Sequence, residues 1–173
     1  VISGPLAGTS TRPANSEVLH VGDPSVIDCL TSLGVNLFAT SNNHAWDLNT
    51  GGIMSTIQAL DERGLSFAGT GRNLAAASRP AFLKGSGSVA LVAAASGAIR
   101  DGAAATITRP GVNELARGPD GTLTPLDVER YLAAIRIAAS TGATVLAYLH
   151  NHHWEKQKSD TPAWQRALAK AAV

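Results

Sequence analysis

The chain contains 173 residues, with 14 Lys and Arg against 13 Asp and Glu, so its formal net charge is +1. Hydrophobic residues make up 45% and charged residues 16%, a composition that is typical of a globular domain and excludes a disordered chain. The near-neutral charge argues against a nucleic-acid-binding protein, and the apolar runs are too short to predict a membrane span.

Apolar residues alternate along the chain between helical spacing and short runs of strand length. Pro and Gly mark the boundaries, as at Asp23-Pro24, where Asp can cap a helix whose first turn accepts Pro. We expect the following elements in chain order: a helix from 24 to 34, a strand over 35–40, a helix through 53–60 that ends at Gly64, strands over 65–68, 81–84 and 89–95, a helix from 125 to 142, a strand over 143–149 and a last helix that begins near 161–162.

Two segments fall outside these elements. Residues 69–71 form a predicted turn, and residues 97–124 form a long loop rich in Gly, Ala, Thr, Arg and Pro. Long ordered loops often carry function. The sequence 69–73 fits two interpretations, a turn that cradles a phosphate before a helix or a simple tight turn.

The alternation of strands and helices predicts a layered α/β domain. The chain begins with Val1 and ends at Val173, inside a predicted helix. We therefore expect residues 1–173 to be the central part of a single domain, incomplete at both ends.

Two polar clusters each follow directly after an apolar strand, where the loops of an α/β sheet gather at one edge. The first is Asn42-Asn43-His44 with Asp47, and the second contains His150, His152, His153 and Glu155. If the strand continues through His152, the side chains of His150 and His152 share a face, about 6–7 Å apart along the strand. This spacing allows both imidazoles to bind one metal ion, while His153 points away.

Both clusters also allow a structural interpretation. Asn and Asp often end strands through turn chemistry, and histidines at a solvated strand end can cap loops without binding metal. In the long loop, Arg109 is a candidate for binding an anionic substrate, or else a solvated arginine beside a turn. His20 is isolated in the sequence, and we assign it no role.

The first cluster and the residues after it resemble a known family. The shared pattern is Asn42-Asn43-His44-x-x-Asp47, then Gly52, Thr56, Leu60, Gly64, Gly69-x-Gly71-Arg72-Asn73 and Ala77-x-Arg79-Pro80. This pattern is similar to that of the CapA family of capsule-synthesis, or poly-γ-glutamate biosynthesis, proteins, which are similar in turn to calcineurin-like metallophosphoesterases. Gly4-Pro5-Leu6, the segment 109–113 and the strand before His150 extend the resemblance over nearly the whole chain.

The resemblance implies a layered α/β/β/α sandwich of the metallophosphatase type that holds divalent manganese, iron or zinc. In that pattern Asn43 and His150 are metal ligands, and His152 is a second histidine candidate. His44 donates a proton or hydrogen bond to the substrate, and Asp47 orients His44. Two metal ions are expected in the full-length protein, with the remaining ligands outside these 173 residues.

For function, the resemblance implies a CapA-like role in capsule or poly-γ-glutamate biosynthesis. We expect a metal-dependent hydrolase that acts on ester or amide bonds in an anionic polymer or an anionic small molecule. Two alternatives are a non-catalytic component of a polymer synthesis or export complex, and a phosphatase or nucleotidase. The segment carries no targeting signal, which leaves both a cytoplasmic and a cell-envelope location open.

Overall fold

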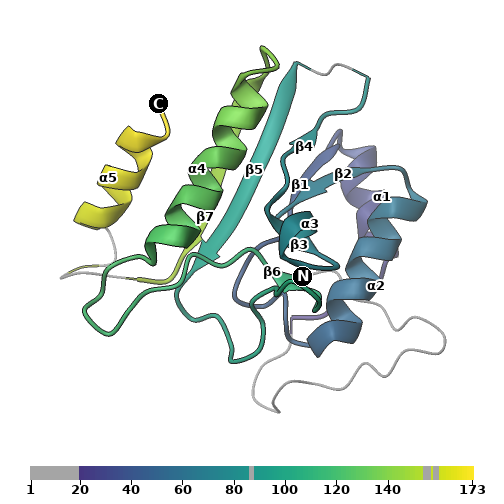
Figure 1. The fold of residues 1–173 in the computed structure, drawn as a ribbon. Coiled ribbons are helices and arrows are strands. Elements are labelled where there is room, and N and C mark those ends of the chain that lie inside the picture. Colours follow the sequence, from purple (N-terminus) through teal and green to yellow (C-terminus); the bar gives the residue numbers. More distant parts are fainter. Residues whose placement is uncertain (1–19, 86–87, 154–156, 158–159) are drawn as a thin grey trace.

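The computed structural model describes residues 20–85, 88–153, 157 and 160–173, which form a mixed arrangement of helices and small sheets (Figure 1). The elements follow in the order α1 (Ser25–Ser32), β1 (Leu37–Ala39), α2 (Asn49–Glu62), β2 (Ser66–Ala68), β3 (Thr70–Gly71), α3 (Leu74–Ser78), β4 (Ala81–Phe82), β5 (Val89–Ser96), β6 (Gly111–Val112), α4 (Pro125–Ala139), β7 (Thr144–Asn151) and α5 (Ala163–Ala171). The predicted α/β class is therefore confirmed.

The largest sheet has the strand order β4-β5-β7. β5 pairs antiparallel with β4 and parallel with β7, in a register that runs from Val89 opposite Thr144 to Ser96 opposite Asn151. Two smaller sheets consist of the parallel pair β1-β2 and the antiparallel pair β3-β6. Parallel neighbours such as β5 and β7 need a crossover between them, and the segment that contains α4 supplies it.

The central strand β5 is buried along most of its length and contributes to a different core on each face. On one face, Val92 and Ala94 pack with residues of α4 such as Ile135. On the other face, Leu91 and Ala93 pack with residues of β1 and β2. A strand that is covered on both faces has almost no place for polar side chains, which explains its Val- and Ala-rich sequence.

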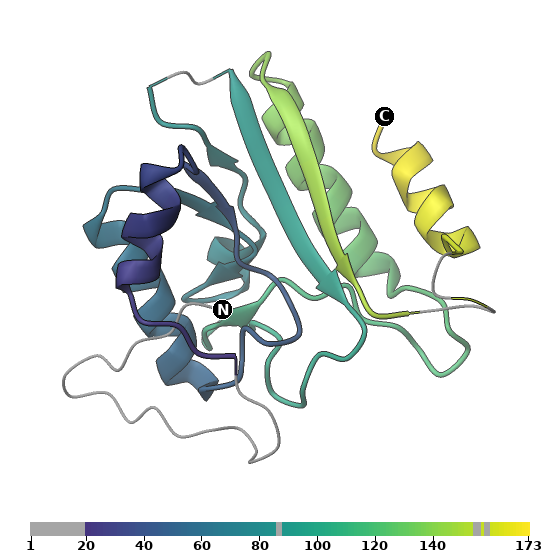
Figure 2. The ribbon, with the colours of Figure 1, turned by 180° about the vertical axis from the view of Figure 1, so that it is seen from behind.

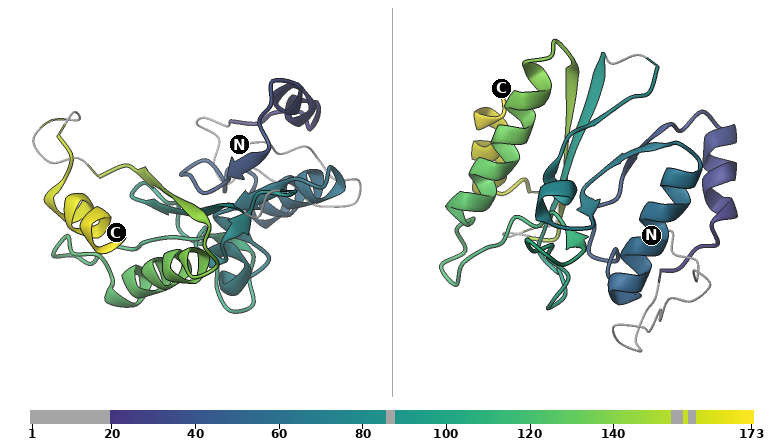
Figure 3. Two further views of the ribbon diagram at one scale, coloured as in Figure 1. Left: turned by 90° about the horizontal axis from the view of Figure 1, so that it is seen from above. Right: turned by 45° about the vertical axis from the view of Figure 1, so that its right-hand side comes forward.

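Helices α1 and α2 cover the side of β1-β2 that faces away from β5. Ile27 of α1 and Leu60 of α2 pack there with Phe38 of β1. The layers therefore follow in the order α4, β4-β5-β7, β1-β2, then α1 with α2. Figures 2 and 3 show α4 and α5 on one side of the strands and α1 and α2 on the other. This order agrees with the α/β/β/α arrangement that the family resemblance implies.

The segments at 69–73 and 97–124 contain more regular structure than the sequence predicts. Thr70 and Gly71 form β3, which pairs with β6 inside the predicted loop. A Cβ atom at position 71 would lie 2.2 Å from the backbone nitrogen of Ala77, so the close approach to α3 requires glycine. The side chain of Asn73 caps α3 by accepting a hydrogen bond from the backbone of Ala76. A close contact and a helix cap thus account for the 69–73 sequence.

The strand β7 ends later than the sequence predicts. It continues past Leu149 to Asn151, and the backbone N–H of His152 still donates to the carbonyl oxygen of Ser96 at 2.9 Å. The predicted residues Gly4-Pro5-Leu6 and Glu155 lie outside the described part of the chain. Among the helices that the structure describes, none has both the length and the apolar character that a membrane crossing requires.

Candidate metal and catalytic site

The two polar clusters of the sequence meet at one edge of the strand layers. The first cluster follows β1, whereas the second lies at the end of β7. The side-chain oxygen Oδ1 of Asn43 lies 2.8 Å from Nε2 of His150, although 107 positions separate the two residues. The packing of β1-β2 against β5, and the pairing of β5 with β7, therefore bring the two clusters together.

The turn 40–48 presents the first cluster, and hydrogen bonds fix its shape. The backbone N–H and the hydroxyl of Thr40 both donate to the carbonyl oxygen of Ala68, each at 2.9 Å. Oδ1 of Asn42 accepts a hydrogen bond from the backbone N–H of His44 at 2.9 Å, as in an Asx turn. Asn49 then adopts a left-handed backbone conformation (φ 54°), which Asn tolerates better than most residues, and begins α2.

Asp47 is completely buried and is the centre of this cluster. Its Oδ2 lies 3.0 Å from Nδ1 of His44 and accepts a hydrogen bond from the backbone N–H of His20 at 2.8 Å. Its Oδ1 lies 3.1 Å from Nη2 of Arg100. A buried carboxylate needs such partners to compensate for lost hydration. Because Asp47 contacts Nδ1 of His44, Nε2 is the ring nitrogen of His44 that remains for other contacts.

His20 belongs to this cluster, which the sequence analysis did not foresee. Its Nδ1 lies 3.1 Å from Nδ1 of His44, and the centroids of the two rings are 3.8 Å apart. His20 is thus isolated in the sequence but not in the structure. No sequence pattern links a single histidine before α1 to a turn after β1, so only the three-dimensional structure could place it here.

Arg100 lies beside Asp47, a position that no sequence pattern indicates. Arg109, the arginine predicted to bind an anionic substrate, is on the same loop. The guanidinium of Arg109 donates to the carbonyl oxygen of Ala104 at 3.0 Å and lies over the ring of Trp46, 6.0 Å from its centroid. Arg109 is exposed on the loop, two residues before β6. Its predicted contact with an anionic substrate stays a prediction.

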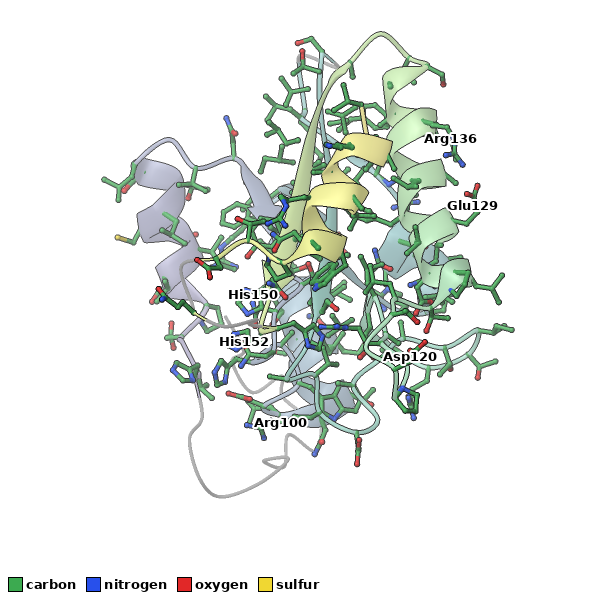
Figure 4. The ribbon with its side chains drawn as sticks, turned by 90° about the vertical axis from the view of Figure 1, so that its left-hand side faces the viewer. Arg100, Asp120, Glu129, Arg136, His150 and His152 are labelled. Carbon is green, nitrogen blue, oxygen red and sulfur yellow. The ribbon has the colours of Figure 1, made fainter. Side chains whose placement is uncertain are left out.

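His150 of β7 and His152, which directly follows the last residue of this strand, lie side by side, as the strand alternation predicts (Figure 4). Their ring centroids are 4.8 Å apart, and the hydroxyl of Tyr148 lies 3.5 Å from Nδ1 of His150. Burial lowers the pKa of His150, and the nearby His152 and His44 imidazoles lower this pKa further. His150 is therefore biased toward the neutral form, whose nitrogen lone pair can bind a metal ion.

His153 points away from this pair, as predicted. Its ring lies edge-on to Trp164, with the centroids 6.0 Å apart, and its backbone N–H donates to Oδ1 of Asn151. Burial lowers the pKa of His153, with Arg117 and His152 as further causes. His153 thus belongs to the contact between β7 and α5, and not to the contact between His150 and Asn43.

The contact between Asn43 and His150 fits a divalent metal ion. When Nε2 of His150 carries its hydrogen, the 2.8 Å contact is a hydrogen bond. Two ligands about 2.0–2.2 Å from one octahedral ion lie about 2.8–3.1 Å apart, so the same spacing suits two ligands of one metal. An amide oxygen and an imidazole nitrogen, with His152 as a second imidazole, suit manganese, iron or zinc.

Comparison with known proteins identifies two similar sequences. Two curated proteins of Sinorhizobium fredii (strain NBRC 101917 / NGR234), which carry the names Uncharacterized protein y4sH and Uncharacterized protein y4uA, are each 35% identical to the chain over 102 residues. The matched stretch covers 56% of this chain and 22% of each relative. The chain therefore spans only a minor part of the length of these relatives.

The family model described as Bacterial capsule synthesis protein PGA_cap matches residues 3–173, which is nearly the whole chain. The match includes the turn 40–48, β7 and all the site residues described above. The chain thus belongs to the PGA_cap family of bacterial capsule synthesis proteins, the CapA family that its Asn-Asn-His motif resembles.

Proposed function

We propose that the protein containing this chain is a metal-dependent hydrolase of capsule biosynthesis. In this proposal it cleaves ester or amide bonds in an anionic substrate, such as poly-γ-glutamate or another capsule polymer. The observation that carries the proposal is the 2.8 Å contact between Asn43 and His150, next to a histidine that a buried carboxylate orients. Membership of the capsule synthesis family supports the substrate class.

Asn43, His150 and His152 are the residues proposed to hold the metal ion. A divalent ion at this position would supply Lewis-acid polarisation of the bond to be cleaved. The lowered pKa of His150 favours this role, because a protonated imidazole cannot bind a metal ion. The proposal includes a second ion in the full-length protein, with ligands that residues outside this chain provide.

His44 and Asp47 are proposed to act on the leaving group of the substrate. The contact between Asp47 and Nδ1 of His44 fixes the ring, and Nε2 is then available to donate a hydrogen bond or a proton. The ion pair with Arg100 keeps the Asp47 side chain in place. In this proposal Arg109 attracts the anionic substrate from the exposed loop, because the nearly neutral chain provides little general attraction.

Metal content and turnover of the full-length protein test the proposal. The protein is stripped with a chelator, reloaded with Mn²⁺ and assayed on a phosphate ester, a carboxylate ester and poly-γ-glutamate. We expect His44→Ala to reduce kcat by about 10²–10⁴-fold with Mn²⁺ still bound, because a proton donor contributes about that much. We expect His150→Ala to lower the affinity for Mn²⁺ by at least about 100-fold, because it removes a direct ligand.

His153→Ala is the matched control, because this histidine is on the same segment but packs against Trp164. It should retain both Mn²⁺ and turnover. A wild-type protein that binds no divalent metal and hydrolyses none of the substrates would contradict the enzyme proposal. That outcome would favour a non-catalytic component of a polymer synthesis or export complex. Hydrolysis of the phosphate ester alone would favour the phosphatase or nucleotidase alternative.

A further inference from the structure

His20, His44 and Asp47 together have the features of a ligand set, and the contacts of His20 are not used in the proposed hydrolysis. Nδ1 of His20, Nδ1 of His44 and Oδ2 of Asp47 are mutually close, with distances of 3.1, 3.0 and 3.9 Å. Two imidazole nitrogens and one carboxylate oxygen form a common three-residue donor set for zinc. Ligands at about 2.0–2.2 Å from a tetrahedral zinc ion lie about 3.3–3.6 Å apart, so shifts of a few tenths of an ångström suffice.

Hydrogen atoms satisfy only one of the two close contacts of His44 Nδ1 at a time. Nδ1 of His44 faces both the carboxylate oxygen of Asp47 and Nδ1 of His20, and a neutral imidazole nitrogen carries at most one hydrogen. A hydrogen on His44 Nδ1 would have to be shared between two acceptors. A hydrogen on His20 Nδ1 alone would leave the lone pair of His44 directed at the carboxylate oxygen. A divalent cation, in contrast, accepts a lone pair from each of the three atoms.

The surroundings of Asp47 leave one of its oxygens for this purpose. Arg100 lies at Oδ1, 3.1 Å away, so the oxygen that faces the two imidazoles is Oδ2. The backbone N–H of His20 donates to Oδ2 and thereby fixes the position of His20 next to the carboxylate. The side chain of His20 is 55% exposed, which gives an ion a path from solvent and leaves room for water as a fourth ligand.

We propose that His20, His44 and Asp47 form a zinc-binding site of this chain, in addition to the proposed metal ligands Asn43, His150 and His152. The ion binds Nδ1 of His44 in place of the direct hydrogen bond between His44 and Asp47, so the zinc-bound form and the hydrogen-bonded form used in the proposed hydrolysis are alternatives. The site does not depend on the proposed hydrolase activity, because its ligands are defined by their mutual distances alone.

Zinc titration of the chelator-stripped, full-length protein tests the site. The measurements use a competing chromophoric chelator for Zn²⁺ affinity and the visible absorption of Co²⁺ as a probe of four-coordinate geometry. The His150→Ala variant serves as the background, because it removes a ligand of the other group. We expect this variant to bind one Zn²⁺ more than the double variant His150→Ala, His20→Ala, because the additional change should weaken binding at this site by at least about 100-fold.

The matched control adds His153→Ala to the same background, and Zn²⁺ binding should then stay unchanged. Circular dichroism verifies that the His20 variant is folded, which we expect because the side chain is largely exposed. The inference is wrong if the His150→Ala protein binds no Zn²⁺, or if adding His20→Ala leaves the affinity unchanged. Failure of the proposed hydrolase is recognised separately, by a wild-type protein that hydrolyses none of the assayed substrates with Mn²⁺, so the two results are distinguishable.

Discussion

The turn 40–48 and the end of β7 place their polar side chains by different physical means. In the turn, the buried carboxylate of Asp47 contacts His20, His44 and Arg100, which belong to three separate segments of the chain. On β7, the alternation of a regular strand places His150 and its neighbouring imidazole on one face. The first arrangement depends on polar partners for the buried charge of Asp47. The second depends on backbone hydrogen bonds between β5 and β7, which substitutions of side chains leave intact.

The largest expected effect comes from removing the charge at the centre of the turn. Asp47→Ala leaves Arg100 without its partner and removes the acceptor for both histidines. We expect the free energy of unfolding to fall by about 3 kcal/mol, at the low end for a broken buried pair because Arg100 is still 22% exposed. Urea denaturation of the full-length protein measures the change.

Asp61→Ala is the matched control for the Asp47 variant. Asp61 is also paired with an arginine, Arg72, but both side chains are more than half exposed and their atoms are 3.8 Å apart. We expect a change below about 0.5 kcal/mol, because exposed ion pairs contribute little. Equal losses for the two variants would show that burial of Asp47 is not what stabilises the turn.

A second substitution disturbs the turn through backbone contact and leaves its charges intact. Gly69 has a φ of 105°, and a Cβ atom there would lie 2.5 Å from Oγ and 2.8 Å from the backbone nitrogen of Ser41. We expect Gly69→Ala to lower the free energy of unfolding by about 2–3 kcal/mol. It should also weaken Mn²⁺ binding, because Ser41 lies two residues before the proposed ligand Asn43.

Gly142→Ala separates backbone strain from this contact. Gly142 also has a positive φ, 81°, but a Cβ atom there would meet nothing within 4 Å. Only the strain of about 1 kcal/mol should remain, and Mn²⁺ binding should not change. Thermal denaturation and Mn²⁺ titration of both variants measure the difference, and a Gly69 variant as stable as the Gly142 variant would contradict the close contact with Ser41.

Arg100 and Arg109, both on the loop over residues 97–124, test the difference between a buried and an exposed partner, with smaller expected effects on stability. Arg100→Ala should cost about 1–2 kcal/mol, less than the full loss of a buried ion pair, because the backbone N–H of His20 and the imidazole of His44 still contact the Asp47 carboxylate. Arg109→Ala should cost less than about 1 kcal/mol, because it removes an exposed hydrogen bond and a contact with Trp46. Chemical denaturation ranks the two variants, and the reverse order would show that Arg109 has the greater structural role.

The smallest expected effect concerns Glu114, a carboxylate outside both regions. Burial and the negative charges of Asp127 and Asp101 raise its pKa above the ordinary value of 4.5, while Arg130 acts in the opposite direction. Between the unfolded and folded pKa values the folded protein holds more protons than the unfolded chain, so its stability decreases as the pH rises from 4.5. Glu114→Gln should remove this decrease and raise the Tm slightly at pH 7.

Melting curves of the wild type and the Glu114→Gln variant between pH 4 and pH 7 give the measurement. A Tm for the variant that still falls over this range, in parallel with the wild type, would contradict the assignment to Glu114. The result also allows Glu114 to be compared with Asp47, a carboxylate of the turn. Asp47 is the more deeply buried carboxylate, but it has two imidazoles, a guanidinium and a backbone N–H around it.

The layered fold and the strand-end histidines followed from local sequence patterns. The apolar spacing of the helices and the alternation in β7 are properties of neighbouring residues, so the face shared by His150 and His152 was predictable. The position of Asn43 beside His150 was expected only in the coarse sense that strand ends gather at one edge. The contact itself depends on how the two strand layers pack.

The partners of Asp47 were not predictable, because they come from segments whose sequences carry no signal for each other. His20 precedes α1, and Arg100 follows β5 on a loop that has no helical or strand periodicity. The same limit applied to Thr70-Gly71, where the antiparallel pairing with residues 111–112 joins two short segments that each read as irregular. Long-range pairing of two-residue strands leaves no periodicity in the sequence.

The alanines of β5 set the spacing of the proposed metal ligands. Asn43 follows β1, and His150 is on β7, which is fixed to β5 by the ladder. The layer between them includes the side chains of Ala93 on β5 and Ala68 on β2. A larger residue at position 93 would move the β1-β2 layer outward and pull Asn43 away from His150. Methyl-sized side chains in the core thus keep the two layers close enough for Asn43 to contact His150.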